Sequence, residues 1–146
     1  MMHHHLVLRT IARALLPAIF LYALYVQWHG DYGPGGGFQA GVIFAVGFIL
    51  YALIYGVDAL NRVVPPRLFV GLLAIGLFIY AGTGFATLLL GGNFLDYSAL
   101  AQDPVHGQEW GILIVELGVG ITVASAMTLI FLAFAGRTAS VADKDW

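Results

Sequence analysis

Four long apolar runs separated by short polar segments make up most of this chain. They cover residues 6–28, 37–57, 68–90 and 110–135. A hydrocarbon core about 30 Å thick needs about 20 residues of helix, so each run is long enough to cross a membrane. None of the runs alternates with the period of a barrel strand, and backbone in lipid must satisfy its own hydrogen bonds. The pattern therefore predicts an all-α integral membrane protein with four transmembrane helices in a single membrane domain, residues 1–146.

Composition agrees with a protein that works inside the bilayer. Of the 146 residues, 60% are hydrophobic and 10% are charged, whereas soluble domains carry about 25% charged residues. The longest segment outside the runs is too short to bury a soluble core. The six basic residues are scattered and the net charge is −2, so we expect no nucleic-acid binding. The chain has no cysteine, which excludes disulfides and thiolate-held clusters, and we expect neither a cofactor nor a bound metal.

The positions of the basic residues predict how the chain is oriented. All of them lie before or within the start of the first run, between the second and third runs, or after the fourth: Arg9, Arg13, Arg62, Arg67, Arg137 and Lys144. The two remaining loops contain no Lys or Arg and are acidic. Because cytoplasmic segments hold the excess of Lys and Arg, both termini are predicted to be cytoplasmic.

The stretch HGDYGPGGGFQAGV, residues 29–42, separates the first two runs. It is not a phosphate-binding loop, because Phe38, Gln39 and Ala40 follow the glycines where such a loop needs Lys and Ser or Thr. One interpretation is helix packing, since small residues four apart allow two membrane helices to approach closely. Gly37 and Gly41 have that spacing.

Packing does not account for the first half of the stretch. Pro34 biases Gly33 away from helical backbone, so we expect an irregular segment at or just inside the outer membrane face. Such backbone is stable at membrane depth only where protein buries it or where it lines a water-filled cavity. With His29 and Asp31 beside it, the segment is a candidate vestibule for hydrated cations. The alternative is an outer turn whose side chains are simply solvated.

Glu116 is the strongest candidate for ion chemistry. It lies in the fourth run, about two turns below the predicted outer interface. A charged residue near the centre of a membrane helix costs about 2.5 to 3.5 kcal/mol, so an acidic residue there is a functional candidate. A carboxyl group in this setting can hold a proton or Na⁺, because burial favours its neutral form and a nearby cation favours its charged form. The alternative is a structural Glu that bonds to a neighbouring helix.

Two further polar sites give weaker signals. Asp58 lies four residues before Arg62 on the same predicted helix, which favours a simple pair between them. His106 lies near Asp103 and Glu109, but loop residues without fixed spacing rarely form a metal site. We therefore assign neither of them a functional role.

The glycine stretch also carries a resemblance to a known family. It resembles the signature of the MnhB/MrpB proteins of Mrp-type multisubunit Na⁺/H⁺ antiporters, in which a polar pair precedes P-G-G-G-F and a further Gly. The matching positions are Pro34, Gly35, Gly36, Gly37, Phe38 and Gly41. The similarity extends over AGTGFATLLLGGNFLDY and VELGVGITV, where Glu116 takes the acidic position of the family's pattern. This chain departs from the pattern in one place, because Asp31 and Tyr32 separate His29-Gly30 from the motif.

The resemblance implies a function and a set of partners. It implies a non-enzymatic membrane subunit of a hetero-oligomeric complex in the bacterial plasma membrane that exchanges Na⁺ for H⁺, with this subunit contributing to the Na⁺ path and to assembly. The candidate path residues are then Glu116, Asp31 and His29. Two alternatives remain open: a homologous subunit in the membrane arm of a redox-driven hydrogenase or complex I-like assembly, and a purely structural scaffold.

Overall fold

The computed structural model describes residues 2–30 and 33–136 of the chain, with side chains from residue 7 onward. The regular structure of this part is all helical, and it contains no strand. Its elements are α1 (Met2–Trp28), α2 (Gly37–Tyr55), α3 (Val57–Val63), α4 (Pro66–Leu89), the 3₁₀ turn η1 (Tyr97–Leu100) and α5 (Pro104–Ala135). Four of them, α1, α2, α4 and α5, are long and apolar enough to cross a membrane. The predicted fold class is confirmed, while the side of the membrane that each terminus faces stays a prediction.

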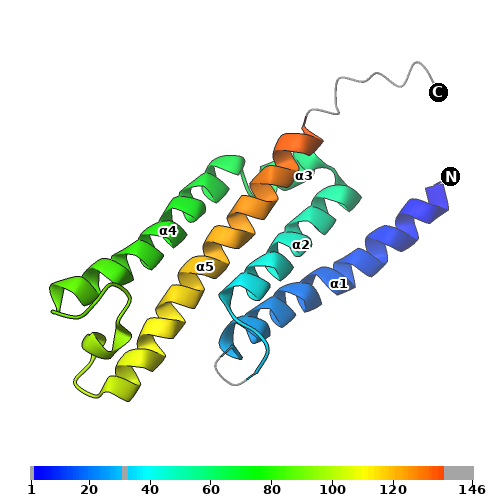
Figure 1. The fold of residues 1–146 in the computed structure, drawn as a ribbon. Helices are drawn as coiled ribbons and strands as arrows, with labels where there is room; N and C mark the ends of the chain where they lie inside the picture. The colour runs from blue at the N-terminus through cyan, green and yellow to red at the C-terminus, as the bar shows by residue number, and fades with distance from the viewer. Residues whose placement is uncertain (1, 31–32, 137–146) are drawn as a thin grey trace.

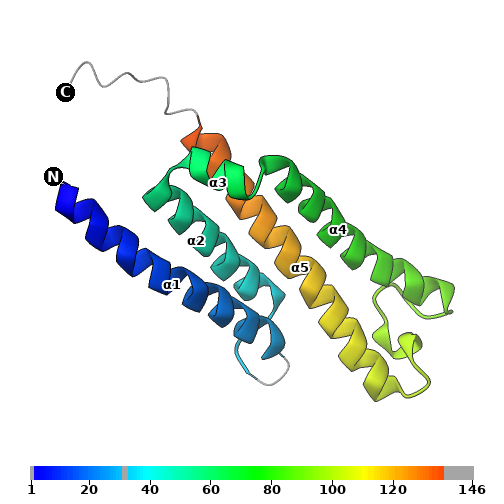
Figure 2. The same cartoon turned by 180° about the vertical axis from the view of Figure 1, so that it is seen from behind.

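The four long helices stand side by side in the order α1, α2, α5, α4 (Figures 1 and 2). The last helix in sequence is thus inserted between α2 and α4. The first turns of α1 and the last turn of α5 lie at the same end of the bundle, as expected for a chain that crosses a membrane four times (Figure 1). A row of this kind leaves much of each helix surface without a neighbour inside the chain.

Small residues explain why α5 lies in the middle of the row. A Cβ atom added to Gly41 of α2 would lie 2.6 Å from the carbonyl oxygen of Gly120, and one added to Gly76 of α4 would lie 2.6 Å from that of Gly118. Both neighbours therefore approach the α5 backbone more closely than any side chain allows, which is the ordinary use of glycine between membrane helices. Thr122 completes the α4 contact and donates its hydroxyl hydrogen bond to the Gly118 carbonyl at 2.8 Å.

Several helix boundaries differ from those expected from hydrophobicity, and two of the differences have a clear structural cause. The last helix begins at Pro104, six residues before the expected start at Trp110, because the Asp103 side chain caps it by accepting the Val105 N–H at 3.0 Å. Proline at the first helical position is favourable because its missing N–H has no helical partner to lose. The second helix ends at Tyr55, where Gly56 has φ 98°, and the residues after it form the separate short helix α3.

Different connections close the bundle at the two ends of its helices. At one end, α3 folds Leu60 into a cluster with Phe69 of α4 and Leu132 of α5. Here Arg62 donates its Nε–H to the main-chain carbonyl of Asp58 at 3.3 Å. The two residues expected to pair are therefore joined through the Asp58 main chain. At the other end, the loop after α4 is held by Thr87, whose hydroxyl accepts the Leu95 N–H at 3.0 Å.

Candidate functional site

Glu116 lies against the glycine turn that joins α1 to α2. A Cβ atom added to Gly36 would lie 2.8 Å from Oε1 of Glu116, and one added to Gly30 would lie 2.9 Å from both carboxylate oxygens. A Cβ atom on Gly37 would collide with the Glu116 main-chain carbonyl. Gly30 and Gly36 thus form a close-fitting backbone wall beside the half-buried Glu116 side chain, and Gly37 packs against the Glu116 main chain.

The turn owes its shape to main-chain hydrogen bonds and to one glycine conformation. The Gly33 N–H donates to the His29 carbonyl at 3.1 Å, and the Gly36 N–H donates to the Val26 carbonyl at 3.3 Å. The chain therefore folds back over the last turn of α1 before α2 begins. Gly36 adopts φ 124° and ψ 179°, a backbone region that is essentially restricted to glycine. The irregular segment predicted from Pro34 is thus present, and it faces the carboxylate.

The depth of this turn follows from the helices beside it. Gly118, half a turn from Glu116 on α5, contacts Gly76 of α4. From Gly76, α4 continues to Leu89, about 20 Å further at 1.5 Å per residue. Figure 1 likewise shows α4 and α5 extending past the α1–α2 turn. Glu116 and the turn therefore lie level with the middle of α4, well inside the membrane-spanning part of that helix.

Two cavities lie on either side of the Glu116 level, and Trp28 lines both. They are named the outer and the inner cavity after the predicted orientation of the chain. The outer cavity, about 770 Å³, lies between Trp28 and the first turns of α5 and includes His106, Gln108 and Glu109. The inner cavity, about 260 Å³, is lined by residues of all four long helices. Its walls are mostly apolar, with Gln27 and Ser125 supplying polar side chains.

The structure places the other predicted residues as follows. The ring of His29 stacks on Tyr25 with ring centroids 4.9 Å apart and also lies next to Gly33. Asp31 lies outside the described residues. Of the motif residues, Gly36, Gly37 and Gly41 are buried, while Pro34 and Phe38 are exposed.

The acidic residues between α4 and the first turns of α5 form no metal centre in the described part of the chain. His106 and Glu109, which were expected in a loop, lie in α5. His106 Nδ1 lies 3.1 Å from Asp103 Oδ2, with both side chains exposed, and no group of three or more potential ligands comes together among the described residues.

Nearby, burial raises the pKa of the Tyr97 phenol, and Tyr80 raises it further. Tyr97 therefore remains protonated at neutral pH and is not a proton-exchanging group there.

Two residues near the site were given no functional role from the sequence. Gln27 packs its Oε1 against Gly120, one turn below Glu116, where an added Cβ would lie 2.6 Å away. Glu109 lies two turns above Glu116 on α5 and borders the outer cavity. The spacing of Glu109, Leu113 and Glu116 on one helix face could have indicated Glu109. The contact of Gln27 joins α1 to α5, and no pattern in the neighbouring sequence predicts it.

Comparisons with known proteins decide the family. A family described as a domain related to the MnhB subunit of Na⁺/H⁺ antiporters matches residues 7–129. The chain belongs to the MnhB family. It is 32% identical to a protein named antiporter subunit mnhB2 from Staphylococcus haemolyticus, over 93% of this chain and 98% of the relative. It is 29% identical to the corresponding Na⁺/H⁺ antiporter subunit of Alkalihalophilus pseudofirmus, over 80% and 87% of the two chains. The resemblance drawn from the glycine motif is therefore confirmed.

Proposed function

We propose that this MnhB-family chain is a subunit of a Na⁺/H⁺ antiporter in the bacterial plasma membrane, and that Glu116 is an exchange site on its ion path. In this role the carboxyl group holds a proton in one state and Na⁺ in the other. Other subunits of the complex are its partners, Na⁺ and H⁺ are its substrates, and it needs no cofactor and catalyses no chemical reaction. Membership of the MnhB family favours the antiporter over the redox-driven membrane arm.

The observation that carries this proposal is the contact between Glu116 and the glycine turn. Gly30 and Gly36 bring bare backbone to the carboxylate oxygens, and glycine at Gly36 is required by its φ of 124°. Irregular backbone at membrane depth is typical of ion sites in transporters, where freed backbone groups help bind ions.

The surrounding groups suit a hard monovalent cation. Na⁺ resembles Ca²⁺ and Mg²⁺ in preferring oxygen ligands, and carboxylate, amide and main-chain oxygens are all present within one turn of Glu116. The Gln27 side chain lies beside Gly120, where the inner cavity begins. Glu109, the one acidic residue among the described residues that line the outer cavity, would attract cations to the site, since negative charge in a cleft raises the local concentration of cations.

Replacing Glu116 by Gln and by Asp tests the proposal directly. Gln keeps most of the hydrogen-bonding capacity but cannot titrate, whereas Asp retains the carboxyl group one methylene nearer the helix. We expect Glu116→Gln to lose most Na⁺-driven proton movement in inverted vesicles. Glu116→Asp should keep part of it, with a shifted pH profile and a changed Na⁺ dependence. Native gels would verify that both variants assemble.

A carboxylate elsewhere in the chain provides the control. Asp58 is exposed and lies in α3, at the opposite end of the helices from the glycine turn. Asp58→Asn therefore makes the same chemical change away from the site and should leave antiport unchanged. Undiminished antiport in Glu116→Gln would remove Glu116 from the ion path. If deletion of the chain then dissolved the complex, the scaffold alternative would replace the proposal.

A further inference from the structure

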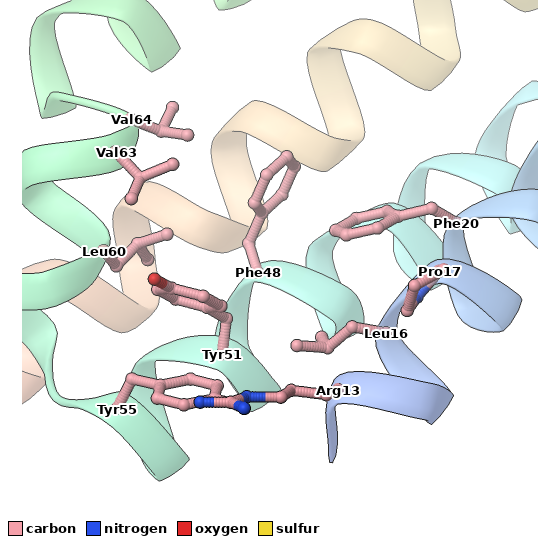
Figure 3. A pocket seen from close by; sticks show the side chains of 10 residues that line it. All are labelled: Arg13, Leu16, Pro17, Phe20, Phe48, Tyr51, Tyr55, Leu60, Val63 and Val64. Carbon is pink, nitrogen blue, oxygen red and sulfur yellow. The ribbon is translucent and has the colours of Figure 1, made fainter. Parts of the chain in front are cut away.

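A cavity of about 660 Å³ lies at the end of the helices where α3 is found, away from the glycine turn. Figure 3 shows the side chains that line it. It opens between α1 on one side and α2 with α3 on the other. Leu16 and Phe20 of α1 form one wall, Phe48 and Tyr51 of α2 form the other, and Val63 of α3 borders the end. The volume is typical of ligand pockets, which span about 300 to 1,000 Å³. It plays no part in the Glu116 site.

The charged side chains at this cavity are arginines. Arg13 is exposed and extends from α1 toward Tyr55 of α2 (Figure 3). One turn earlier, the Arg9 guanidinium carbon lies 6.0 Å from the centroid of the Tyr55 ring, and the Tyr55 hydroxyl donates to the Arg9 carbonyl at 3.1 Å. Among the described residues, none that lines the cavity is acidic. The site therefore combines a positive rim with an apolar interior.

We propose that this cavity binds an anionic phospholipid, with its phosphate at Arg13 and an acyl chain along the wall of Leu16, Phe20 and Phe48. The shape and charge match such a molecule, which has one negative head and a long apolar tail. The placement agrees as well, because the distribution of basic residues predicts that this end lies at the cytoplasmic leaflet, where basic pockets between membrane helices bind acidic head groups. A zwitterionic lipid lacks the net charge that Arg13 would recognise.

Retention of lipid by the purified complex tests the proposal. The complex that contains this chain would be equilibrated in nanodiscs of equal parts dioleoyl phosphatidylglycerol and dioleoyl phosphatidylcholine, and released lipid adducts would be counted by native mass spectrometry. We expect preferential retention of phosphatidylglycerol. Arg13→Gln should lower its apparent affinity about fivefold, which corresponds to the loss of about 1 kcal/mol for one basic residue near the membrane surface.

Arg67 supplies the matched control for charge. It is also exposed and lies at the same end of the row, at the start of α4, but it does not line the cavity. Arg67→Gln should leave phosphatidylglycerol retention unchanged. Equal losses in the two variants would mean that general surface charge attracts the lipid, and equal retention of both lipids by the unaltered complex would mean that no head group is recognised. Either result would overturn the proposal.

Filling the cavity tests the tail separately from the head. Val63 borders the cavity and is 65% exposed, whereas Val70 on α4 is 57% exposed and lies outside it. Val63→Trp should reduce phosphatidylglycerol retention, and Val70→Trp should not. A cysteine at Val63 that crosslinks to another subunit in native membranes would show that a partner helix occupies the cavity, and would refute the lipid assignment.

Discussion

Adding a single methyl group at Gly36 probes the site without touching Glu116. The φ of 124° at Gly36 belongs to a backbone region where a residue with a Cβ atom destabilises the fold by about 1 to 3 kcal/mol. The new Cβ would also lie 2.8 Å from Oε1 of Glu116, whereas ordinary van der Waals contact begins at 3.4 Å. The carboxylate must therefore move by about half an ångström, which is the tolerance to which functional groups must be held.

We expect Gly36→Ala to reduce Na⁺-driven proton movement severalfold at equal levels of assembled complex, and to lower the midpoint of thermal unfolding. Gly82→Ala is the matched control, because Gly82 lies within α4 and a Cβ atom there would meet nothing within 4 Å. Gly47 is unsuitable as a control, although it lies inside regular helix. A Cβ atom on Gly47 would lie 2.6 Å from the Phe20 ring.

A double substitution separates the contact with Glu116 from backbone strain. Asp is one methylene shorter than Glu, so Glu116→Asp withdraws the carboxylate from the Gly36 position. If the contact matters, Gly36→Ala should cost less transport in the Glu116→Asp background than in the native one, a coupling of about 0.5 to 3 kcal/mol for residues in contact. Strictly additive effects would mean that Gly36 serves only to shape the turn, and our account of the wall around Glu116 would then be wrong.

The remaining predictions concern orientation and packing. A cysteine placed at Ser98 should react with an impermeant thiol reagent in intact cells and one at Ser140 should not; the reverse order would overturn the predicted topology. Gly37→Ala should weaken assembly more than Gly71→Ala, because the added Cβ meets the Glu116 carbonyl at Gly37 and open space at Gly71. Thr87→Val should lower the unfolding free energy by about 1 to 3 kcal/mol, since it leaves a main-chain N–H without its buried acceptor; thermal unfolding would measure it.

The sequence predicted the four membrane helices because each is a long apolar run and lipid permits few other structures. It also predicted the break at Pro34, since proline limits the residue before it. The start of α5 was missed because the hydrophobicity pattern does not contain the signal, which is the Asp103 cap followed by Pro104. The break at Gly56 was missed for a similar reason, because a glycine in an apolar run is compatible with a continuous helix.

The order of the helices and the surroundings of Glu116 could not be read from the sequence. Stripes of small residues indicate that close approach occurs, but they do not name the partner helix. In the structure, Gly41 faces Gly120 and Gly76 faces Gly118, so two neighbours share the one helix α5. Only this arrangement brings the turn after α1 beside a carboxylate about eighty residues later in the chain, and that juxtaposition turns two separate candidates into one site.

The open row of helices also bears on why the chain should need partners to transport ions. Alternating access requires that a site be closed from one side while it is open to the other, and transporters achieve this by moving one repeat or bundle against another. Here one half-buried carboxylate lies between two cavities, and both cavities are bordered by exposed residues such as Trp28. A second surface that covers these cavities in turn would gate access to Glu116. Within this chain the Gly36 N–H is bonded to the Val26 carbonyl of α1, which holds the start of α2 to the end of α1, so we infer that the moving surface is part of another protein of the complex.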